Sequence, residues 1–368
     1  MIIGVPKEIK IGENRVGLTD ASVRQLVTEG HTVYIEKDAG LGSHISNETY
    51  EKVGAKLLPS AKEVWAKAQM IVKVKEPLPE EYDLMKEDLI LYTYLHLAPE
   101  PKLTKALCDR KVKAIAYETI QLEDGSLPLL TPMSEVAGRM ATQVGATYLQ
   151  KDRGGMGVLL GGVTGVERST VTVIGGGVVG INSAKMAIGL GAEVIILDVN
   201  HRRLEYLDDV FQGRIQTLYS NALNIEKSVQ RSHLVIGGVL VTGHRAPRLV
   251  TKEMVSRMMK GSVIVDVAVD QGGCIETCRP TSHTQPTFEV DGVIHYAVPN
   301  MPGAVARTST YALNNATYKY CSMLARMGVE DAIAKDKALY LGLNVYNGYV
   351  AYEPVARDLN MEYRPYKI

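Results

Sequence analysis

Cysteine is scarce in this chain, and its scarcity excludes two kinds of structural site. Only 4 cysteines occur among 368 residues, too few for a disulfide scaffold. Cys274 and Cys278 are spaced C-x3-C, but no second pair or nearby histidine cluster completes a zinc site. We therefore expect unpaired thiols in a reducing compartment and no bound metal.

Charge of one sign and long apolar runs are also missing. Lys and Arg number 41 and Asp and Glu number 41, so the net charge is +0 and a nucleic-acid partner is not expected. No apolar run approaches the ~18 residues that span a bilayer. The N-terminus lacks the basic start and long apolar stretch of a signal peptide. These absences predict a cytoplasmic protein that binds neither nucleic acid nor a membrane.

Strand-like and helix-like segments alternate along the chain, which is typical of an α/β protein with parallel sheets. The length suggests about two domains of ~150 residues each. Helical patterns at 21–29 and 61–69 separate β-rich runs in a first series, and 183–189 is a crossover helix in a second. The expected strands are 2–5, 32–36, 70–74, 89–93 and 112–117, followed by 171–174, 194–197, 215–219, 234–239, 263–267 and 294–298.

Two longer helical patterns, 134–151 and 308–326, stand where the two series meet. Ser134 follows Thr-Pro-Met and is able to cap the first of them. We expect a dinucleotide-binding domain of residues 130–305 inserted into a domain built from 1–129 and 306–368. The predicted fold is thus two doubly wound, Rossmann-type parallel-sheet domains with an inter-domain cleft.

Glycines cluster directly after the strand at 171–174 and form the pattern G-x-G-x-x-G. Gly175 allows a tight turn, Gly177 leaves room for a pyrophosphate, and Gly180 lets the following helix pack close to the strand. The next strand ends at Asp198, 18 residues past Gly180, near the usual offset of the acid that binds ribose hydroxyls. The pattern predicts NAD, because an acid there repels a 2′-phosphate.

Two alternatives to this interpretation stay open. Arg202 and Arg203 follow the acid closely and are able to accept a 2′-phosphate, so some use of NADP is compatible with the sequence. A glycine-rich turn in an α/β protein also occurs without any ligand, although the complete strand–turn–helix–strand–acid context disfavours that interpretation here.

Three cationic or titratable residues of the first series follow expected strands. Arg15 lies after the first strand, Lys75 ends the run 70–75, and His96 follows the run 89–95. Because ligands of open α/β sheets bind beyond the carboxyl ends of the strands, we expect a site for a small carboxylate with a proton carrier beside it. Taken singly, each of the three is as compatible with a solvated or packed side chain.

Two further residues end strands of the second series. Asp270 follows the run 263–267 and precedes a glycine pair, so it is a candidate base or a turn-forming acid. Asn300 lies after the run 294–298, where its amide is able to bind a nicotinamide carboxamide.

The chain resembles the NAD-dependent alanine dehydrogenase family in motifs that run from its start to beyond residue 310. They include Gly4-Val-Pro-Lys-Glu-Ile, Glu13-Asn-Arg-Val, Val72-Lys-Val-Lys-Glu-Pro, Thr93-Tyr-Leu-His-Leu-Ala, Leu130-Thr-Pro-Met-Ser-Glu, Asp266-Val-Ala-Val-Asp-Gln-Gly-Gly and Asn300-Met-Pro-Gly-Ala-Val. The resemblance implies reversible deamination of L-alanine to pyruvate and ammonium, with NAD as the oxidant, and a homohexamer.

The resemblance also implies roles for individual residues. Arg15 and Lys75 would hold the substrate carboxylate, and His96 and Asp270 would form the acid/base pair, with no preference between them for activating water. The cofactor contacts that it implies are Ser134, Val178, Asp198, Arg203, Ser220, Val239, Leu240, Val267, Ala268, Val269, Asp270, Arg279, Val298, Pro299, Asn300 and Met301.

Two other functions share parts of these patterns. The NAD-binding portion of a transhydrogenase is similar at 4–8 and 13–16 but does not carry the blocks around His96 and Ser134. A non-catalytic NAD-binding protein is disfavoured because the four expected site residues are all present: Arg15, Lys75, His96 and Asp270.

Overall fold

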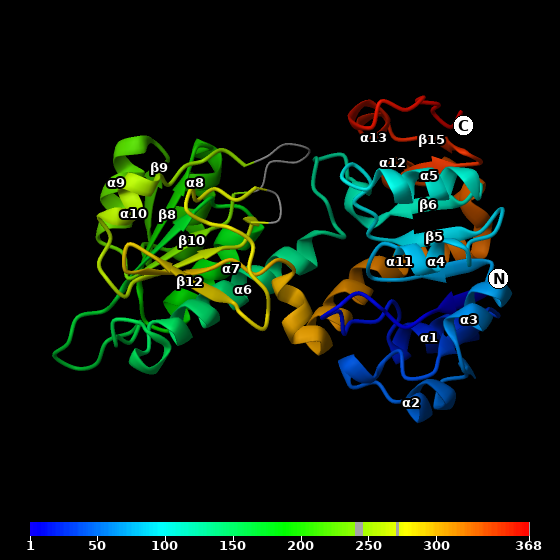
Figure 1. Ribbon diagram of the computed structural model, residues 1–368, viewed down its shortest axis with the longest axis horizontal. Helices are drawn as coiled ribbons and strands as arrows, with labels where there is room; N and C mark the ends of the chain where they lie inside the picture. The colour runs from blue at the N-terminus through cyan, green and yellow to red at the C-terminus, as the bar shows by residue number, and fades with distance from the viewer. Residues whose placement is uncertain (240–245, 270–271, 368) are drawn as a thin grey trace. The chain divides into compact units, whose positions relative to one another are not determined.

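The computed structural model describes residues 1–239, 246–269 and 272–367, and the chain divides into two compact units. One unit consists of Met1–Met133 with Val305–Ile368, and the other is Ser134–Ala304 (Figure 1). Each unit contains one β-sheet with helices packed against it. The predicted α/β class with two Rossmann-type sheets is confirmed.

The sheet of the first unit has eight strands among the described residues, in the order β15-β14-β6-β5-β4-β1-β2-β3. The six from β3 to β6 run parallel, and β14 and β15 extend the sheet antiparallel at one edge. The order reverses at β1, which lies between β4 and β2 and so marks the switch point of the sheet. The bounds are β1 Ile2–Val5, β2 Thr32–Glu36, β3 Lys56–Leu58, β4 Met70–Val72, β5 Ile90–Thr93, β6 Lys113–Ala116, β14 Leu343–Tyr346 and β15 Tyr349–Val350.

Side-chain caps begin several helices of this unit. Thr19, Ser46 and Ser60 each accept a backbone N–H in the first turn of α1, α2 and α3, which satisfies donors that the helix leaves without partners. The helices are α1 Asp20–Thr28, α2 Asn47–Lys52, α3 Ala61–Lys67, α4 Pro79–Tyr82, α5 Pro101–Asp109, α11 Ala306–Lys335, α12 Lys337–Leu341 and α13 Glu353–Asp358, with 3-10 turns η1 Leu41–Ser43 and η2 Tyr117–Thr119.

Helix α11 anchors the loop that follows β1. Thr310 accepts the backbone N–H of Val16 at 3.2 Å, and the Asn314 carboxamide oxygen accepts that of Thr19 at 3.0 Å. All four residues are buried. Segments almost 300 residues apart in sequence therefore fix one loop at the end of the sheet.

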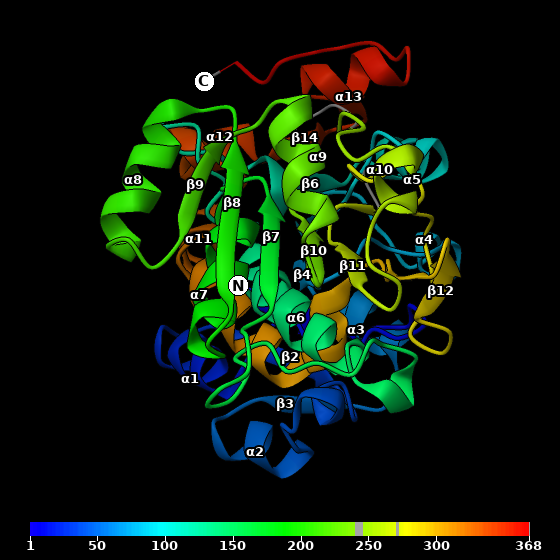
Figure 2. The same ribbon diagram turned by 90° about the vertical axis from the view of Figure 1, so that its left-hand side faces the viewer.

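The sheet of the second unit has the order β12-β13-β11-β10-β7-β8-β9. Strands β9, β8 and β7 lie side by side and run in the same direction (Figure 2). Only β12 is antiparallel among these strands, and the order reverses at β7. The bounds are β7 Thr170–Ile174, β8 Glu193–Asp198, β9 Gln216–Tyr219, β10 Leu234–Gly237, β11 Val263–Asp266, β12 Thr287–Val290 and β13 Val293–Tyr296.

The helices of the second unit cover this sheet through crossover connections. Helix α7 packs on β7, β8 and β10, and α9 packs on β7. The core between them is aliphatic, with Val235, Ile264 and Leu197 fully buried. The helices are α7 Val178–Gly189, α8 His201–Phe211, α9 Ala222–Gln230 and α10 Lys252–Ser256, with the 3-10 turns η3 Lys151–Arg153 and η5 Met301–Val305 and the long helix α6 Thr131–Tyr148.

Some predicted boundaries are wrong. The strand predicted at 70–74 ends at Val72, because the backbone N–H of Val74 donates to the carboxylate of Glu8 instead of a neighbouring strand. Helix α6 starts at Thr131 rather than Ser134, because a proline at the second position, Pro132, suits a first helical turn. Along the chain, the first compact unit ends at Met133 and resumes at Val305. The domain bounds of 130–305 stay a prediction.

None of the helices in the described part of the chain is both long and apolar enough to cross a bilayer.

The contact between α7 and β7 depends on the absence of a side chain at Gly180. A Cβ there would lie 1.9 Å from the carbonyl oxygen of Gly175, whereas a Cβ at Gly189, in the same helix, meets nothing within 4 Å. We expect Gly180→Ala to lower the free energy of unfolding by about 1–3 kcal/mol. Gly189→Ala should raise it by up to ~1 kcal/mol, because alanine is the better helix former. Urea denaturation without cofactor measures both, and equal effects would contradict this packing.

Candidate active site

The carboxyl ends of β1, β4, β5 and β6 carry a group of charged residues in the first unit. Arg15 follows β1, and Lys75 follows β4. The pKa of Lys75 is lowered, first by burial and next by the positive charge of Arg15, so the two cations lie close enough to repel. The structure therefore brings together two of the three predicted cationic residues at one edge of the sheet.

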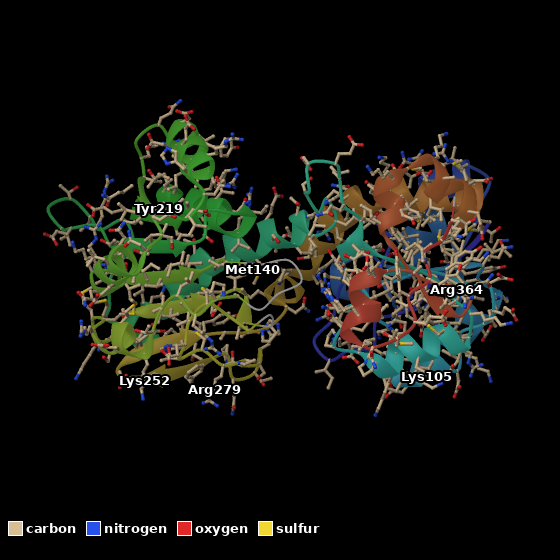
Figure 3. The ribbon with its side chains drawn as sticks, turned by 90° about the horizontal axis from the view of Figure 1, so that it is seen from above. Lys105, Met140, Tyr219, Lys252, Arg279 and Arg364 are labelled. Carbon is tan, nitrogen blue, oxygen red and sulfur yellow. The ribbon has the colours of Figure 1, made fainter. Side chains whose placement is uncertain are left out.

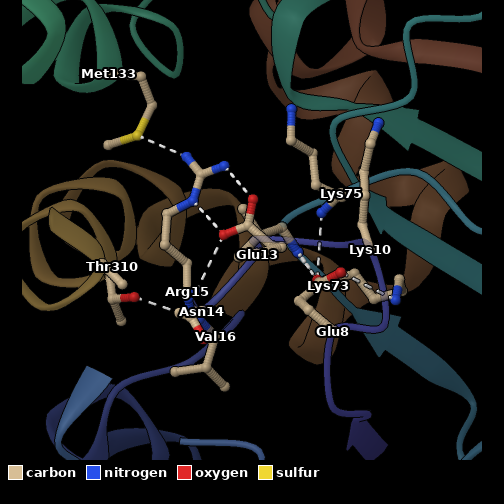
Figure 4. Close-up of polar contacts among 12 residues, drawn as sticks. Glu8, Lys10, Glu13, Asn14, Arg15, Val16, Lys73, Lys75, Met133 and Thr310 are labelled. Carbon is tan, nitrogen blue, oxygen red and sulfur yellow. Dashed lines mark hydrogen bonds and ion pairs between the residues drawn. The ribbon is translucent and has the colours of Figure 1, made fainter. Parts of the chain in front are cut away.

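Arg15 is buried and held by Glu13 (Figure 4). Its Nε donates to Glu13 Oε1 at 2.6 Å and its Nη2 to Oε2 at 2.5 Å, a bidentate pair, while Nη1 lies 3.1 Å from the sulfur of Met133. Burial alone would raise the pKa of Glu13, but the hydrogen bonds and charge of Arg15 lower it below its usual value. Both groups are thus charged, and the guanidinium has one fixed orientation.

A second cluster of buried charges adjoins the backbone of Lys75. The ammonium of Lys73 is 3.2 Å from Glu8 Oε2 and 2.9 Å from Glu81 Oε1, and all three side chains are almost completely buried. Glu8 Oε1 also accepts the backbone N–H groups of Val74 at 2.6 Å and Lys75 at 3.2 Å. The segment after β4 is therefore tied to the segment after β1 by one carboxylate.

Lys75 shares its surroundings with Lys10. The side chains of Arg15, Lys75 and Lys10 extend to the same side of the chain in Figure 4. Lys10 forms an ion pair with Glu76. After burial and the charge of Arg15, the positive charge of Lys10 also lowers the pKa of Lys75, whereas the negative charge of Glu76 raises it. Three cations next to buried carboxylates give this edge of the sheet the chemistry of an anion-binding site.

His96 follows β5 and has a left-handed backbone, with φ 48°. Its side chain is exposed and its ring stacks on that of Tyr94, with 5.8 Å between the ring centroids. The backbone N–H groups of Leu95 and His96 donate to the carboxylate of Glu118, in the latter case at 2.6 Å. The positive charge of Arg15 lowers the pKa of the Tyr94 phenol, against the larger rise that burial causes, so Tyr94 lies near both His96 and Arg15.

In the second unit, the glycine loop follows β7 and has the geometry of a phosphate cradle. Gly175 has φ 97°, which favours glycine, and an added Cβ at Gly177 would meet nothing within 4 Å. Gly177 precedes Val178, the first residue of α7, whose free N–H groups and positive dipole end attract an anion. These features fit the pyrophosphate of a dinucleotide, and α7 is long enough to present them.

Asp198 ends β8 beside this loop. Its Oδ2 accepts the N–H of Gly176 at 2.7 Å and its Oδ1 that of Asn200 at 2.8 Å, so the carboxylate is fixed. Arg203 donates from Nε to the carbonyl of Gly176 and lies over the ring of Tyr206. The acid and the arginine thus flank the first turn of the glycine loop.

The other predicted cofactor residues have varied positions. Ser220 donates its backbone N–H to the Asp198 carbonyl at 3.0 Å, and a Cβ at Gly175 would meet Val239 at 2.9 Å. Arg279 is exposed and its guanidinium lies 4.6 Å from the ring centroid of Phe288, pointing outward in Figure 3. Ser134 lies in α6, Val267, Ala268 and Val269 follow β11, and Val298, Pro299, Asn300 and Met301 follow β13, with Asn300 at φ 59°. Asp270 and Leu240 lie outside the described residues.

Sequence reasoning did not single out the glutamates of this site. The contact of Glu13 with Arg15 could have been predicted from the local sequence, since an acid two residues before a cation is able to fold back on it. No local pattern could have predicted the contacts of Glu8 and Glu118, because their partners are 22 to 67 residues away in sequence. No group of three or more His, Cys, Asp or Glu side chains in the described ranges is arranged to hold a metal.

Comparisons with known proteins match the chain over its whole length. Two family models match, "Alanine dehydrogenase/PNT, N-terminal domain" over residues 4–137 and "Alanine dehydrogenase/PNT, C-terminal domain" over residues 141–353. The chain is 60% identical to an alanine dehydrogenase of Methanococcus maripaludis, covering 99% of this chain and 98% of the relative. It is 58% identical to an alanine dehydrogenase of Bacillus subtilis, covering 99% and 96%.

Solved structures give the same result. An L-alanine dehydrogenase structure superposes with a TM-score of 0.96 at 55% identity, covering 98% of this chain and 99% of the other. A transhydrogenase from Sinorhizobium meliloti superposes with a TM-score of 0.85 at 24% identity, covering 95% and 100%, which shows a shared fold.

The buried cluster of Lys73 generates a stability prediction. Lys73→Met leaves the carboxylates of Glu8 and Glu81 buried without their shared cation, and we expect a loss of about 3–5 kcal/mol in the free energy of unfolding. Lys105→Met is the control, because Lys105 pairs with Asp109 on the exposed surface (Figure 3) and should cost less than ~1 kcal/mol. Chemical denaturation at pH 7 measures both variants. A Lys73→Met protein as stable as the control would contradict a charged, buried cluster.

Proposed function

The chain belongs to the alanine dehydrogenase/PNT family, and from that premise we propose which of its residues carry out its reaction. It is an oxidoreductase that converts L-alanine reversibly to pyruvate and ammonium with NAD as the oxidant. In our proposal, Arg15 and Lys75 bind the substrate carboxylate, and His96 and Asp270 transfer its protons. The unit of Met1–Met133 and Val305–Ile368 binds the substrate, and Ser134–Ala304 binds NAD.

The juxtaposition of Arg15 and Lys75 is the observation that carries this proposal. Glu13 holds two donors of the guanidinium, so the Arg15 side chain is ordered before a ligand arrives, and Glu8 holds the backbone from which the Lys75 side chain extends. Two fixed cations bind a carboxylate in one orientation and so direct the Cα–H bond of the substrate. Such orientation supplies a large share of catalysis in reactions between two bound partners.

His96 and Asp270 share the proton transfers in this proposal. The amine must lose a proton before its lone pair can assist departure of hydride from Cα, water must then add to the imine, and the carbinolamine must collapse. Loss of the ammonium proton and addition of water each release one proton, and collapse of the carbinolamine takes a proton from its hydroxyl and gives one to the departing amine, so a side chain is needed to carry protons at every stage. Histidine suits this task because an imidazole ordinarily exchanges protons near neutral pH, and the His96 side chain is exposed and stacks on Tyr94.

The residues around the glycine loop fit NAD. Gly175 and Gly177 leave space for the pyrophosphate at the first turn of α7, Gly180 lets α7 pack close to β7, and the fixed carboxylate of Asp198 is suited to accept from ribose hydroxyls. When bound, NAD accepts the hydride from Cα. Because Arg203 is engaged with Gly176 and Tyr206, we propose that Asp198 decides against a 2′-phosphate.

We also propose that the protein is a cytoplasmic homohexamer. The four cysteines are unpaired, which agrees with a reducing compartment. Exposed apolar side chains supporting self-association gather on one loop of the second unit: Leu159, Val163 and Val166 are each at least 60% exposed, and Gly161 of the same loop lies against exposed Leu190. The small-molecule substrates need no further partner.

His96→Ala tests the acid/base assignment. We expect kcat to fall by ~10²-fold or more while NADH still binds, because a proton carrier acts mainly in the transition state. His44→Ala is the matched control, since His44 is also exposed and also has a left-handed backbone, with φ 58°. Steady-state turnover with L-alanine and NAD, together with NADH titration, measures both. Near-normal turnover of His96→Ala would remove this residue from the chemistry.

The lowered pKa of Lys75 predicts how pyruvate binding depends on pH. Carboxylate binding needs charged Lys75, so the KM for pyruvate should rise as the pH increases through that lowered pKa. Lys10→Gln removes a repelling charge, raises the pKa of Lys75 and should shift the increase in KM to higher pH, whereas Lys10→Arg should leave it in place. The measurement is the pyruvate KM at saturating ammonium between pH 7 and 10.5. Identical profiles for the two variants would exclude Lys75 as the titrating group.

A further inference from the structure

A glutamate carboxylate accepts the backbone N–H of each of the three site residues in the first unit. Glu13 accepts that of Arg15 at 3.1 Å, Glu8 accepts that of Lys75 at 3.2 Å and Glu118 accepts that of His96 at 2.6 Å. We propose that these three glutamates are positioning residues, and that Glu118 in particular holds His96 in its working orientation. The proposal rests on the function assigned above to Arg15, Lys75 and His96.

Two of these contacts, those of Glu8 and Glu118, cross between neighbouring strand ends. Glu8 lies after β1 and its partner Lys75 lies after β4, which pairs with β1. Glu118 lies in η2 after β6, and its partner His96 lies after β5, which pairs with β6. Each carboxylate therefore fixes the relative position of two adjacent loops at the carboxyl edge of the sheet. Because hydrogen bonds from N–H groups to a charged oxygen are short and strong, they set loop geometry better than neutral contacts do.

His96 needs such a restraint more than the other two residues. Its φ of 48° lies in the left-handed region, which side chains other than glycine rarely adopt. Strained backbone persists only where the surroundings over-determine it. Both oxygens of Glu118 accept the N–H of Leu95, at 3.1 and 3.2 Å, and Oε1 also accepts that of His96. Two consecutive amides are thus fixed at the turn from which the imidazole projects.

Glu118 is the glutamate whose substitution is easiest to interpret, because among the described residues it does not compensate a buried cation. Glu13 also binds the guanidinium of Arg15, and Glu8 also pairs with buried Lys73, so their removal leaves a buried cation without its partner. The hydrogen bonds of the Glu118 carboxylate that the structure describes are all to backbone N–H groups. Its substitution therefore changes the His96 turn without leaving a buried charge unpaired.

The test is a double-mutant cycle between Glu118 and His96. We expect Glu118→Ala to lower kcat about tenfold or more, since small displacements of a catalytic group have large effects, while the pyruvate KM stays within ~2-fold. Glu118→Gln keeps one acceptor oxygen and should recover most of the turnover. In the His96→Ala background, Glu118→Ala should cause no further loss, because there is no imidazole left to position.

Glu13→Gln is the contrasting variant. It weakens the hydrogen bonds that hold the Arg15 guanidinium and should raise the pyruvate KM while kcat changes little. Glu118→Ala should instead lower kcat and leave the pyruvate KM nearly unchanged. Thermal unfolding and NADH titration of every variant identify general destabilisation. If Glu118→Ala does not fold, the cycle is run with Glu118→Gln, whose smaller loss of turnover should appear only when His96 is present.

Two results would overturn the proposal. Equal fractional losses from the Glu118 substitution in both backgrounds would show that it acts independently of His96. A raised pyruvate KM with unchanged kcat would place Glu118 with the carboxylate-binding groups instead. High turnover of the His96→Ala single variant would refute the acid/base assignment itself, so the two failures are distinguishable.

Discussion

Burying cations at the edge of a sheet requires buried carboxylates beside them, and the first unit is organised by that constraint. Arg15 and Lys73 are 2% and 1% exposed, and isolated charges at such sites would be very unfavourable. Glu13 and the pair Glu8 and Glu81 supply the compensating charge at hydrogen-bonding distance. Because these carboxylates also accept backbone N–H groups, electrostatic compensation and loop geometry depend on the same contacts.

Both sheets reverse their strand order at the strand that begins their series, β1 in one and β7 in the other. The loops that follow these strands then lie beside those of neighbouring strands, which opens space for a ligand. The two units use this arrangement differently. The first places cations and acids in its loops, which suits a small carboxylate, and the second places glycines and a helix N-terminus there, which suits a dinucleotide.

Features of the fold that depend on local sequence patterns could be predicted from the sequence. The alternation of strands and helices and the glycines after β7 are encoded in short windows, and the α/β class followed from them. Strands β3, β12, β14 and β15, at or next to the edges of the sheets, were not predicted, because strands of two to four residues carry little periodicity. The early end of β4 and the contacts of Glu118 depend on partners distant in the sequence, which no local pattern reveals. The roles of Arg15, Lys75, His96 and Asp270 stay predictions.

The decisive measurement is a crystal structure of the protein with pyruvate bound. The carboxylate oxygens of pyruvate should lie within ~3.2 Å of both the Arg15 guanidinium and the Lys75 ammonium, with the Glu13 and Glu8 contacts kept. Pyruvate bound away from both cations, or an Arg15 side chain that leaves Glu13 to reach its ligand, would contradict it.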